Sequence, residues 1–243
     1  MGVKRDSTLD GFLGGRLSIA QPRRGFRAGH DTVLLAASVP AQAGSHVLEL
    51  GSGAGVASLC LALRVPALRV TGIEIDPELV ALANENAERN GLAERVRFAC
   101  ADATSFGGSP AFDHAFFNPP FHPASGEESP SRARDRAMRE VSNAIPDWTR
   151  IALALTHPGG TTTAILRADR AEEMLAAGDG VGAVLFPLFP RTGEAPKRTI
   201  IQFLKGSRKP RRVAAGLVLH EQDGRNTQGA EAVLRHGAML RLV

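Results

Sequence analysis

The sequence is poor in cysteine and lacks tyrosine. Its 243 residues contain two cysteines, one tryptophan and no tyrosine. Two cysteines cannot form a disulfide framework, so a reducing, cytoplasmic setting is expected. Cys60 and Cys100 both lie in apolar stretches, where a cysteine is most often a small buried side chain. The low cysteine content excludes a disulfide-rich secreted domain.

Long apolar runs and metal-ligand spacings are also missing. No apolar run is long enough to cross a bilayer, and the first residues lack the apolar core of a secretory signal. The seven histidines form no pair at metal-ligand spacing, and neither cysteine has a neighbour for one. We therefore expect no membrane span and no metal site.

The apolar residues are arranged in short runs that alternate with helical patterns. At 43% hydrophobic residues the chain can bury a full core. Alternating strands and helices predict a mostly parallel sheet that is covered by helices on both faces, an α/β fold. The seven predicted strands are 46–50, 69–75, 96–100, 114–117, 161–166, 183–186 and 199–204.

The predicted helices have recognisable ends. Asp76 and Pro77 are typical of a helix start, and Asn90-Gly91 of its end. Asp169 followed by Glu172 resembles a capping box, with Gly178 closing that helix. A helix is also predicted over 30–39, an added strand over 213–220 and a terminal helix over 227–236.

We interpret residues 1–45 as an N-terminal leader and residues 46–243 as the main part of one globular domain. Between the fourth and fifth strands, residues 121–142 are polar and rich in Pro, Gly and Ser. A loop of that length in a compact domain is usually functional or disordered. Trp148, which follows this loop at a predicted helix start, is expected in the core rather than on a binding surface.

A glycine-rich turn follows the first predicted strand. The sequence there is Val-Leu-Glu-Leu-Gly-Ser-Gly-Ala-Gly, residues 47–55, and a helix comes next. Glycines at such a turn let a ligand approach the backbone. Glu74 ends the second strand, where a carboxylate can accept hydrogen bonds from both hydroxyls of a ribose. The turn and the carboxylate together predict a nucleotide-like cofactor, whereas either feature alone would also fit a plain turn or a solvated strand end.

The glycine spacing indicates which cofactor. A dinucleotide site requires G-x-G-x-x-G, but this turn reads G-x-G-x-G with Glu49 just before it. An acidic residue is a poor neighbour for a pyrophosphate and a good one for an ammonium group. A nicotinamide-dependent dehydrogenase is therefore disfavoured.

The pattern E-x-G-x-G-x-G with an acidic end to the second strand resembles class I S-adenosylmethionine-dependent methyltransferases. The resemblance implies a Rossmann-like, seven-stranded, mostly parallel sheet, with S-adenosylmethionine bound at the carboxyl ends of the first three strands. In that family the glycine loop lies against the amino-acid part of the cofactor, and the second-strand acid holds the ribose. The residues carried over are Glu49, Gly51, Gly53, Gly55 and Glu74.

A further cofactor residue follows the third strand. The family commonly places an aspartate there to take the adenine amino group, which makes Asp102 the candidate. Asp102 would equally suit a helix N-cap, and the sequence leaves both roles open.

The fourth predicted strand runs into Asn118-Pro119-Pro120-Phe121. Two consecutive prolines stiffen the backbone and remove two N–H donors, while their carbonyls remain acceptors. The Asn118 amide oxygen and the Pro119 carbonyl can thus accept hydrogen bonds from one NH₂ group, and Phe121 can stack on a flipped-out base. The alternative is a rigid structural turn with a core phenylalanine.

This turn resembles the [D/N/S]-P-P-[F/Y/W] motif of amino methyltransferases, which modify exocyclic amines of bases or the side-chain amide of glutamine. The resemblance assigns catalysis to Asn118, Pro119, Pro120 and Phe121. Many relatives have tyrosine at the last position, so this chain loses a hydroxyl there and keeps the stacking face.

The leader segment 21–37 resembles the N-terminal motif of the bacterial tRNA1(Val) (adenine-37-N6) methyltransferase family. In those proteins the segment packs over the cofactor and shapes the entrance. The resemblance implies cofactor contacts for Arg27 and Asp31, with His30 as a further polar member.

Positive charge is concentrated near the C-terminus. Residues 191–212 contain eight Lys or Arg against Glu194 alone, a local charge of +7. This favours a polyanionic partner such as nucleic acid, although a solubilising surface would look the same. The candidate phosphate contacts are Arg191, Lys197, Arg198, Arg208, Lys209, Arg211 and Arg212.

Together these features predict an S-adenosylmethionine-dependent transfer of methyl to an exocyclic amine, foremost adenine N6 in tRNA. Three alternatives stay open: protein glutamine N5, guanine N2 in rRNA, and a non-catalytic RNA-binding module gated by the cofactor.

Overall fold

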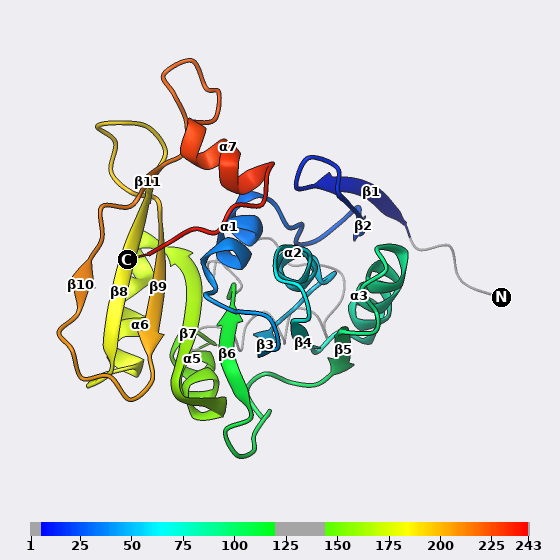
Figure 1. Ribbon diagram of the computed structural model, residues 1–243, viewed down its shortest axis with the longest axis horizontal. Helices are drawn as coiled ribbons and strands as arrows, with labels where there is room; N and C mark the ends of the chain where they lie inside the picture. Colours follow the sequence, from blue (N-terminus) through cyan, green and yellow to red (C-terminus); the bar gives the residue numbers. More distant parts are fainter. Residues whose placement is uncertain (1–5, 120–143, 243) are drawn as a thin grey trace.

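The computed structural model describes residues 6–119 and 144–242. Its centre is a sheet with the strand order β8-β9-β7-β6-β3-β4-β5 (Figure 1). Neighbouring strands run parallel except that β9 is antiparallel to both β7 and β8. The strands are β3 (His46–Leu50), β4 (Arg69–Glu74), β5 (Val96–Cys100), β6 (Phe112–Phe117), β7 (Thr156–Arg167), β8 (Gly182–Phe189) and β9 (Arg198–Leu204). The predicted α/β class and all seven strands are confirmed.

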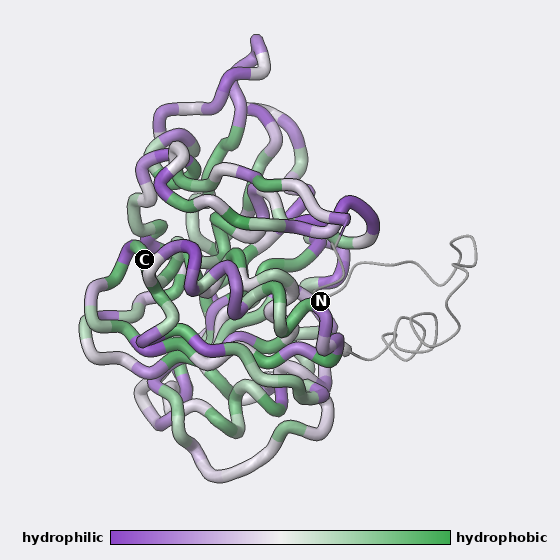
Figure 2. The backbone as a smooth tube through the Cα atoms, turned by 90° about the vertical axis from the view of Figure 1, so that its right-hand side faces the viewer, coloured by the Kyte–Doolittle hydropathy of each residue, from purple (hydrophilic) through white to green (hydrophobic). Residues whose placement is uncertain are grey.

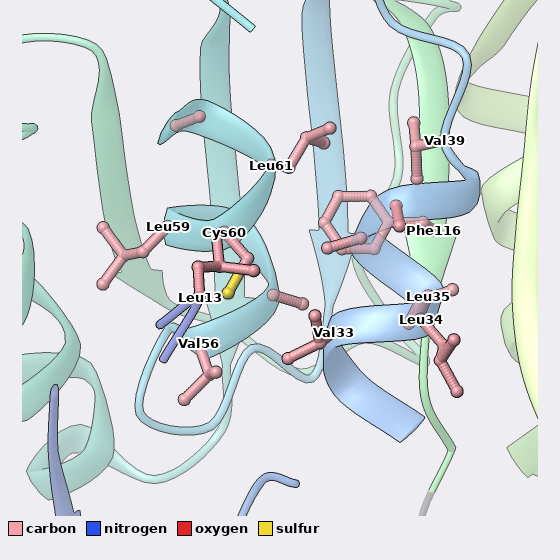
Figure 3. Packing of buried hydrophobic residues seen from close by; sticks show 14 of the residues in the cluster. Leu13, Val33, Leu34, Leu35, Val39, Val56, Leu59, Cys60, Leu61 and Phe116 are labelled. Carbon is pink, nitrogen blue, oxygen red and sulfur yellow. The ribbon is translucent and has the colours of Figure 1, made fainter. Parts of the chain in front are cut away.

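Helices cover both faces of this sheet. One face carries α1 (His30–Ser38), α2 (Val56–Arg64), α3 (Pro77–Arg89) and α7 (Gln228–Leu234); the other carries α5 (Ala144–Leu155) and α6 (Ala171–Ala177), preceded by the 3-10 turn η2 (Ala168–Arg170). Alternate strand residues enter opposite cores, because successive side chains of a strand point to opposite faces. Phe116 lies beside Leu35 and Val39 of the α1 segment (Figure 3), whereas Phe117 packs on the α5 side.

Two very short strands extend the sheet beyond β8. β10 (Arg212–Val213) and β11 (Leu217–Val218) both pair with β8 in parallel. The added strand predicted over 213–220 is therefore two short strands. Hydrophobic residues (green in Figure 2) concentrate in the interior, and hydrophilic residues (purple) on the outer loops. None of the described helices is long and apolar enough to span a bilayer.

The leader contains a hairpin that the sequence reasoning missed. β1 (Ser7–Phe12) pairs antiparallel with β2 (Leu17–Pro22), and the connecting turn has positive φ at Leu13, Gly14 and Gly15. The Gly-Gly pair between two short runs was the available signal. β2 packs on α3, where the Asn86 amide exchanges hydrogen bonds of 2.8 and 2.9 Å with the backbone of Ala20.

Helix ends confirm most of the predicted caps. The Asp76 carboxylate accepts a hydrogen bond of 2.9 Å from the Glu78 N–H, and Gly178 follows the last residue of α6. The predicted capping box at Asp169 is wrong. Asp169 instead pairs with Arg167 at 2.5 Å, because a guanidinium two residues away offers it a stronger partner than a helix N–H.

The parallel strands define two edges that matter below. We call the edge where β3 to β8 end the carboxyl edge, and the opposite one the amino edge. Since β9 runs the other way, the β8–β9 loop lies at the carboxyl edge and the β9–β10 connection at the amino edge (Figure 1). In doubly wound folds, ligands bind at the carboxyl edge.

Candidate active site

The glycine loop after β3 has a backbone that only glycine adopts readily. Gly51, Gly53 and Gly55 have φ of 67°, 53° and 84°. A Cβ at Gly51 would lie 2.6 Å from the Trp148 ring, and one at Gly55 would lie 2.6 Å from the Phe98 ring. A Cβ at Gly53 would meet no atom within 4 Å. The outer glycines thus permit close packing, while the middle one faces open space that a ligand can enter.

Glu49, just before this loop, is a buried acid. Its carboxylate accepts a hydrogen bond of 3.1 Å from the Ser58 N–H and another from the Ser58 hydroxyl. Ser58 belongs to the first turn of α2, whose N-cap Gly55 offers no side chain, so Glu49 satisfies these helix donors instead. Burial raises the pKa of Glu49 to about 8, the Ser58 hydrogen bonds oppose this, and the nearby charge of Glu74 adds to it. A cation beside Glu49 would favour the ionised form.

Glu74 joins the glycine loop to the end of β4. One carboxylate oxygen accepts a 2.9 Å hydrogen bond from the Gly53 N–H. The other accepts hydrogen bonds from the N–H groups of Ile75 (2.8 Å) and Asp76 (3.1 Å). Three backbone donors fix the carboxylate beside the loop, where the sequence predicted it would hold a ribose.

Ile75 is a further candidate for the cofactor site that the sequence did not reveal. Its side chain is 54% exposed at the carboxyl edge, directly after Glu74. An exposed apolar side chain beside a fixed carboxylate offers a flat ring a surface to pack on. The signal was its position immediately after the acidic end of the strand.

Asp102 follows β5 and is exposed. Its carboxylate accepts hydrogen bonds of 2.8 Å from both the N–H and the hydroxyl of Thr104. This is an Asx turn, and no helix begins there, so the N-cap alternative is wrong. The adenine contact of Asp102 stays a prediction. Cys100, the last residue of β5, is exposed rather than buried as expected, because β5 is an edge strand of the sheet.

The catalytic turn begins at the end of β6, next to the glycine loop. Leu50 pairs with Phe117 in the sheet register, so Asn118 continues alongside Gly51. The Asn118 amide oxygen is buried and has no hydrogen-bond partner among the described residues. Leaving a buried acceptor unpaired costs about 1–3 kcal/mol, so a ligand donor is the natural partner. Pro119 is buried; Pro120 and Phe121 lie outside the described residues.

Trp148 of α5 fills the space between the two loops. Its ring abuts Gly51 and meets the Phe117 ring edge-on, with centroids 5.9 Å apart and planes at 78°. It is half-buried against the core on the α5 side, which agrees with the expected core role only in part. The ring therefore packs directly against the glycine loop and against the last residue of β6.

The leader residues Arg27 and Asp31 have partners within the protein. The Arg27 guanidinium donates hydrogen bonds to the Thr8 hydroxyl (2.8 Å), the Pro22 carbonyl (2.9 Å) and the Asp10 carboxylate (2.5 Å). Asp31 forms an ion pair of 2.7 Å with Arg198 at the start of β9. These contacts hold Arg27 against the leader hairpin and tie α1 to the carboxyl edge, and the cofactor contacts of Arg27 and Asp31 stay predictions.

The basic residues predicted to bind nucleic acid do not form one surface. Arg191, Lys197 and Arg198 lie at the carboxyl edge, and the other four at the amino edge. The seven residues of β9 separate the groups by about 20 Å of extended chain. Arg211 is also held by the Leu175 carbonyl (2.7 Å) and Asp179 (3.2 Å). The intervening strand β9 thus carries the two groups to opposite edges of the sheet, and the nucleic-acid contacts of all seven residues stay predictions. The other residues at the amino edge are Arg208, Lys209 and Arg212.

The residues present fit S-adenosylmethionine. The site offers a buried acid for an ammonium group, a fixed carboxylate for a ribose and an open glycine backbone. Buried hydroxyl or amide oxygens without a partner among the described residues occur in three segments near this edge, at Thr32, Ser52 and Asn118. A polar ligand would supply the missing donors and acceptors. The described residues hold no group of three His, Cys, Asp or Glu side chains suited to a metal.

Comparisons with known proteins agree with this geometry. Residues 27–142 match the model of the methyltransferase small domain family. A solved structure from Agrobacterium tumefaciens, described as a predicted O-methyltransferase, superposes with a TM-score of 0.74 at 25% identity, covering 87% of this chain and 98% of the other. The chain is an S-adenosylmethionine-dependent methyltransferase with the class I fold, and residues 27–142 are similar to the methyltransferase small domain family.

Curated relatives carry two different acceptor names. A tRNA1(Val) (adenine(37)-N6)-methyltransferase from Glaesserella parasuis is 27% identical over 198 residues, covering 80% of this chain and 83% of the relative. One from Porphyromonas gingivalis is 34% identical, covering 65% and 66%. A release factor glutamine methyltransferase from Chlorobaculum tepidum is 33% identical, covering 67% of this chain and 60% of the relative.

Proposed function

We propose that this methyltransferase modifies an exocyclic amine, N6 of an adenine in tRNA, in the cytoplasm. The observation that carries the proposal is the unpaired, buried Asn118 amide oxygen beside the first glycine of the cofactor loop. An NH₂ group placed there would complete a hydrogen bond that the described part of the protein leaves unmade. The relatives named tRNA1(Val) (adenine(37)-N6)-methyltransferase support the same acceptor.

The protein's part in the reaction is positioning. S-adenosylmethionine supplies an electrophilic methyl group on a sulfonium when it is bound. Asn118 Oδ1 accepts a hydrogen bond from the amine, and the Pro119 carbonyl offers a second acceptor next to it. Two acceptors turn the NH₂ group out of conjugation with its ring, so that its lone pair can point at the methyl carbon. Holding reacting groups in line in this way removes much of the entropic barrier.

Cofactor residues act on the other side of the transfer. Glu49 places a carboxyl group near the ammonium end, Glu74 holds the ribose and Asp102 takes the adenine amino group. The leader forms one wall of this site, which is supported by the packing of Ala20 against Ala54 and Leu82.

Protein glutamine N5 is the second candidate acceptor. The glutamine methyltransferase relative favours it, and a side-chain amide offers the same flat NH₂ group to Asn118. Lys197 at the carboxyl edge favours RNA instead, beside Arg191 and Arg198, which pair with Glu194 and Asp31, because a polyanion needs neutralising charge beside the site.

Labelled methyl donor and separate acceptor fractions test the choice. The protein is incubated with the donor and with bacterial tRNA, rRNA, DNA or protein, and the labelled fraction is digested to nucleosides or amino acids. We expect labelled N6-methyladenosine from tRNA and none with Asn118→Ala. Label in N5-methylglutamine or N2-methylguanosine would refute the adenine assignment, and cofactor binding without any transfer would indicate a non-catalytic module.

A further inference from the structure

The loop between β2 and α1 presents an aromatic side chain to solvent. Residues 23–29, which we call the leader loop, contain Phe26 with 61% of its surface exposed. Arg24 beside it is exposed and has no hydrogen bond or ion pair to another described residue. An exposed aromatic ring two residues from an arginine without a described partner is a candidate contact for a flat, negatively charged partner.

The leader loop is held rigidly at its base. The Gln21 side chain, 3% exposed, accepts a 2.8 Å hydrogen bond from the Ala28 N–H and donates one of 2.8 Å to Asp10. Arg27 adds its three hydrogen bonds to the hairpin, and Gly25 turns the tip with φ of 89°. Because the buried Gln21 amide holds the base of the leader loop, Arg24 and Phe26 at its exposed tip are pre-organised for a partner.

Both ends of the leader loop are anchored at the carboxyl edge. Upstream, the Asn86 amide donates hydrogen bonds to the carbonyls of Ala20 (2.9 Å) and Ala54 (3.0 Å), which connects β2 to the glycine loop. Downstream, Asp31 pairs with Arg198, the neighbour of Lys197 in the β8–β9 loop. The tip therefore lies on the side of the molecule where Asn118 would receive its acceptor.

We propose that Phe26 stacks on an unpaired base of the acceptor RNA, next to the nucleotide that Asn118 engages, while Arg24 contacts the adjoining phosphate. This rests on the proposed RNA acceptor and adds a second base contact outside the catalytic turn. An aromatic face binds any base, and an adjacent arginine neutralises the backbone. Such a contact grips the single-stranded loop from which the target base must be extruded.

Three substitutions of Phe26 distinguish stacking on a base from simple apolar contact. Phe26→Ala and Phe26→Leu remove the aromatic face, Phe26→Trp keeps it, and Val213→Ala at the amino edge is a control because Val213 is 73% exposed and far from the site. Each variant is tested for binding of unfractionated bacterial tRNA, for the KM of methylation and for the affinity of S-adenosylmethionine.

We expect Phe26→Ala and Phe26→Leu to weaken RNA binding about 10-fold to 100-fold, Phe26→Trp to bind like wild type, and cofactor affinity to stay constant. Arg24→Ala should lower the salt dependence of RNA binding by about one counterion. Equal RNA binding by Phe26→Ala and wild type would overturn the inference, and so would a matching loss of cofactor affinity, since Phe26 would then pack on the cofactor. If wild type itself neither binds nor methylates RNA, the proposed function fails first, which is a distinct result.

Discussion

Both edges of the sheet carry basic residues, but they differ in how their polar groups are satisfied. At the amino edge the Lys205 ammonium donates to the carbonyls of Ala154 (3.1 Å) and Thr156 (2.6 Å), and Arg211 binds Leu175 and Asp179. At the carboxyl edge the Asn118 oxygen has no described partner, Glu49 is buried with a raised pKa, and apolar Ile75 is exposed. Positive charge is common to both edges, so it does not locate the site. A lone unpaired polar atom does not locate it either, since the buried Arg64 Nε near the amino edge has no partner among the described residues. The site is marked by the combination of an unpaired acceptor, a buried acid with a raised pKa and an exposed apolar side chain at one edge.

The largest effect should come from removing the unpaired acceptor. Asn118→Ala deletes the oxygen that orients the amine, and we expect kcat to fall at least about 100-fold. Cofactor affinity measured by calorimetry should change no more than a few-fold. Asn118→Asp keeps an acceptor oxygen and should recover part of the activity. A fully active alanine variant would show that the unpaired Asn118 oxygen does not mark the catalytic edge.

Matched glycine substitutions compare the backbones of the two edges. Gly51→Ala forces both a left-handed backbone and a 2.6 Å clash with Trp148, and we expect a loss of about 3 kcal/mol in the free energy of unfolding, with weaker cofactor binding. Gly206→Ala at the amino edge has a similar φ of 87° but open space around it, so about 1 kcal/mol is expected. Denaturant unfolding, followed by the fluorescence of the single tryptophan, measures both. Equal losses would contradict the close packing of Trp148 on Gly51.

The pH dependence of stability tests the buried acid. The pKa of Glu49 in the folded chain is about 8, above its ordinary value of 4.5. Between these values the unfolded chain has released a proton that the folded chain keeps, so the free energy of unfolding should fall as pH rises from 4.5 to 8 and level off above. The slope contributed by this one group is at most about 1.4 kcal/mol per pH unit.

Glu49→Gln removes this titration and should flatten the profile over the same range. Bound S-adenosylmethionine should favour the ionised carboxylate, so wild type should release a proton on binding near pH 7 and the glutamine variant should not. Calorimetry in two buffers of different ionisation enthalpy measures that proton. Identical profiles for the two proteins would show that Glu49 is not the titrating group.

The smallest expected effect separates the basic residues. Lys197→Ala at the carboxyl edge should reduce the salt slope of RNA binding by about one, and Arg208→Ala at the amino edge should leave it unchanged. RNA binding at several salt concentrations measures both slopes. A larger change for Arg208 would place the RNA across the amino edge, against the division described here.

Local patterns were enough to predict the sheet and the cofactor loop. Short apolar runs locate strands because a parallel strand is buried on both faces, and glycine spacing next to Glu49 and Glu74 marks a turn whose backbone a ligand approaches. The strands, α2, α3 and the loop are all where these patterns put them. Asn118 was found for the same reason, since its motif is contiguous in sequence.

Features that depend on contacts between distant residues were not predictable. Nothing near residue 27 in the sequence shows that Arg27 turns back to Asp10, and nothing near residue 198 shows its pairing with Asp31. The count of basic residues over 191–212 likewise does not show that β9 places them at opposite edges of the sheet. Ile75 and Phe26 became candidate contact residues only because the structure shows that they are exposed, and the sequence does not predict the exposure of a single apolar residue.

A crystal structure with S-adenosylhomocysteine tests the central claim most directly. The account predicts the ribose at Glu74, the adenine against Ile75, and the sulfur directed toward the Asn118 carboxamide. A cofactor bound away from the glycine loop, or with its sulfur turned from Asn118, would contradict it.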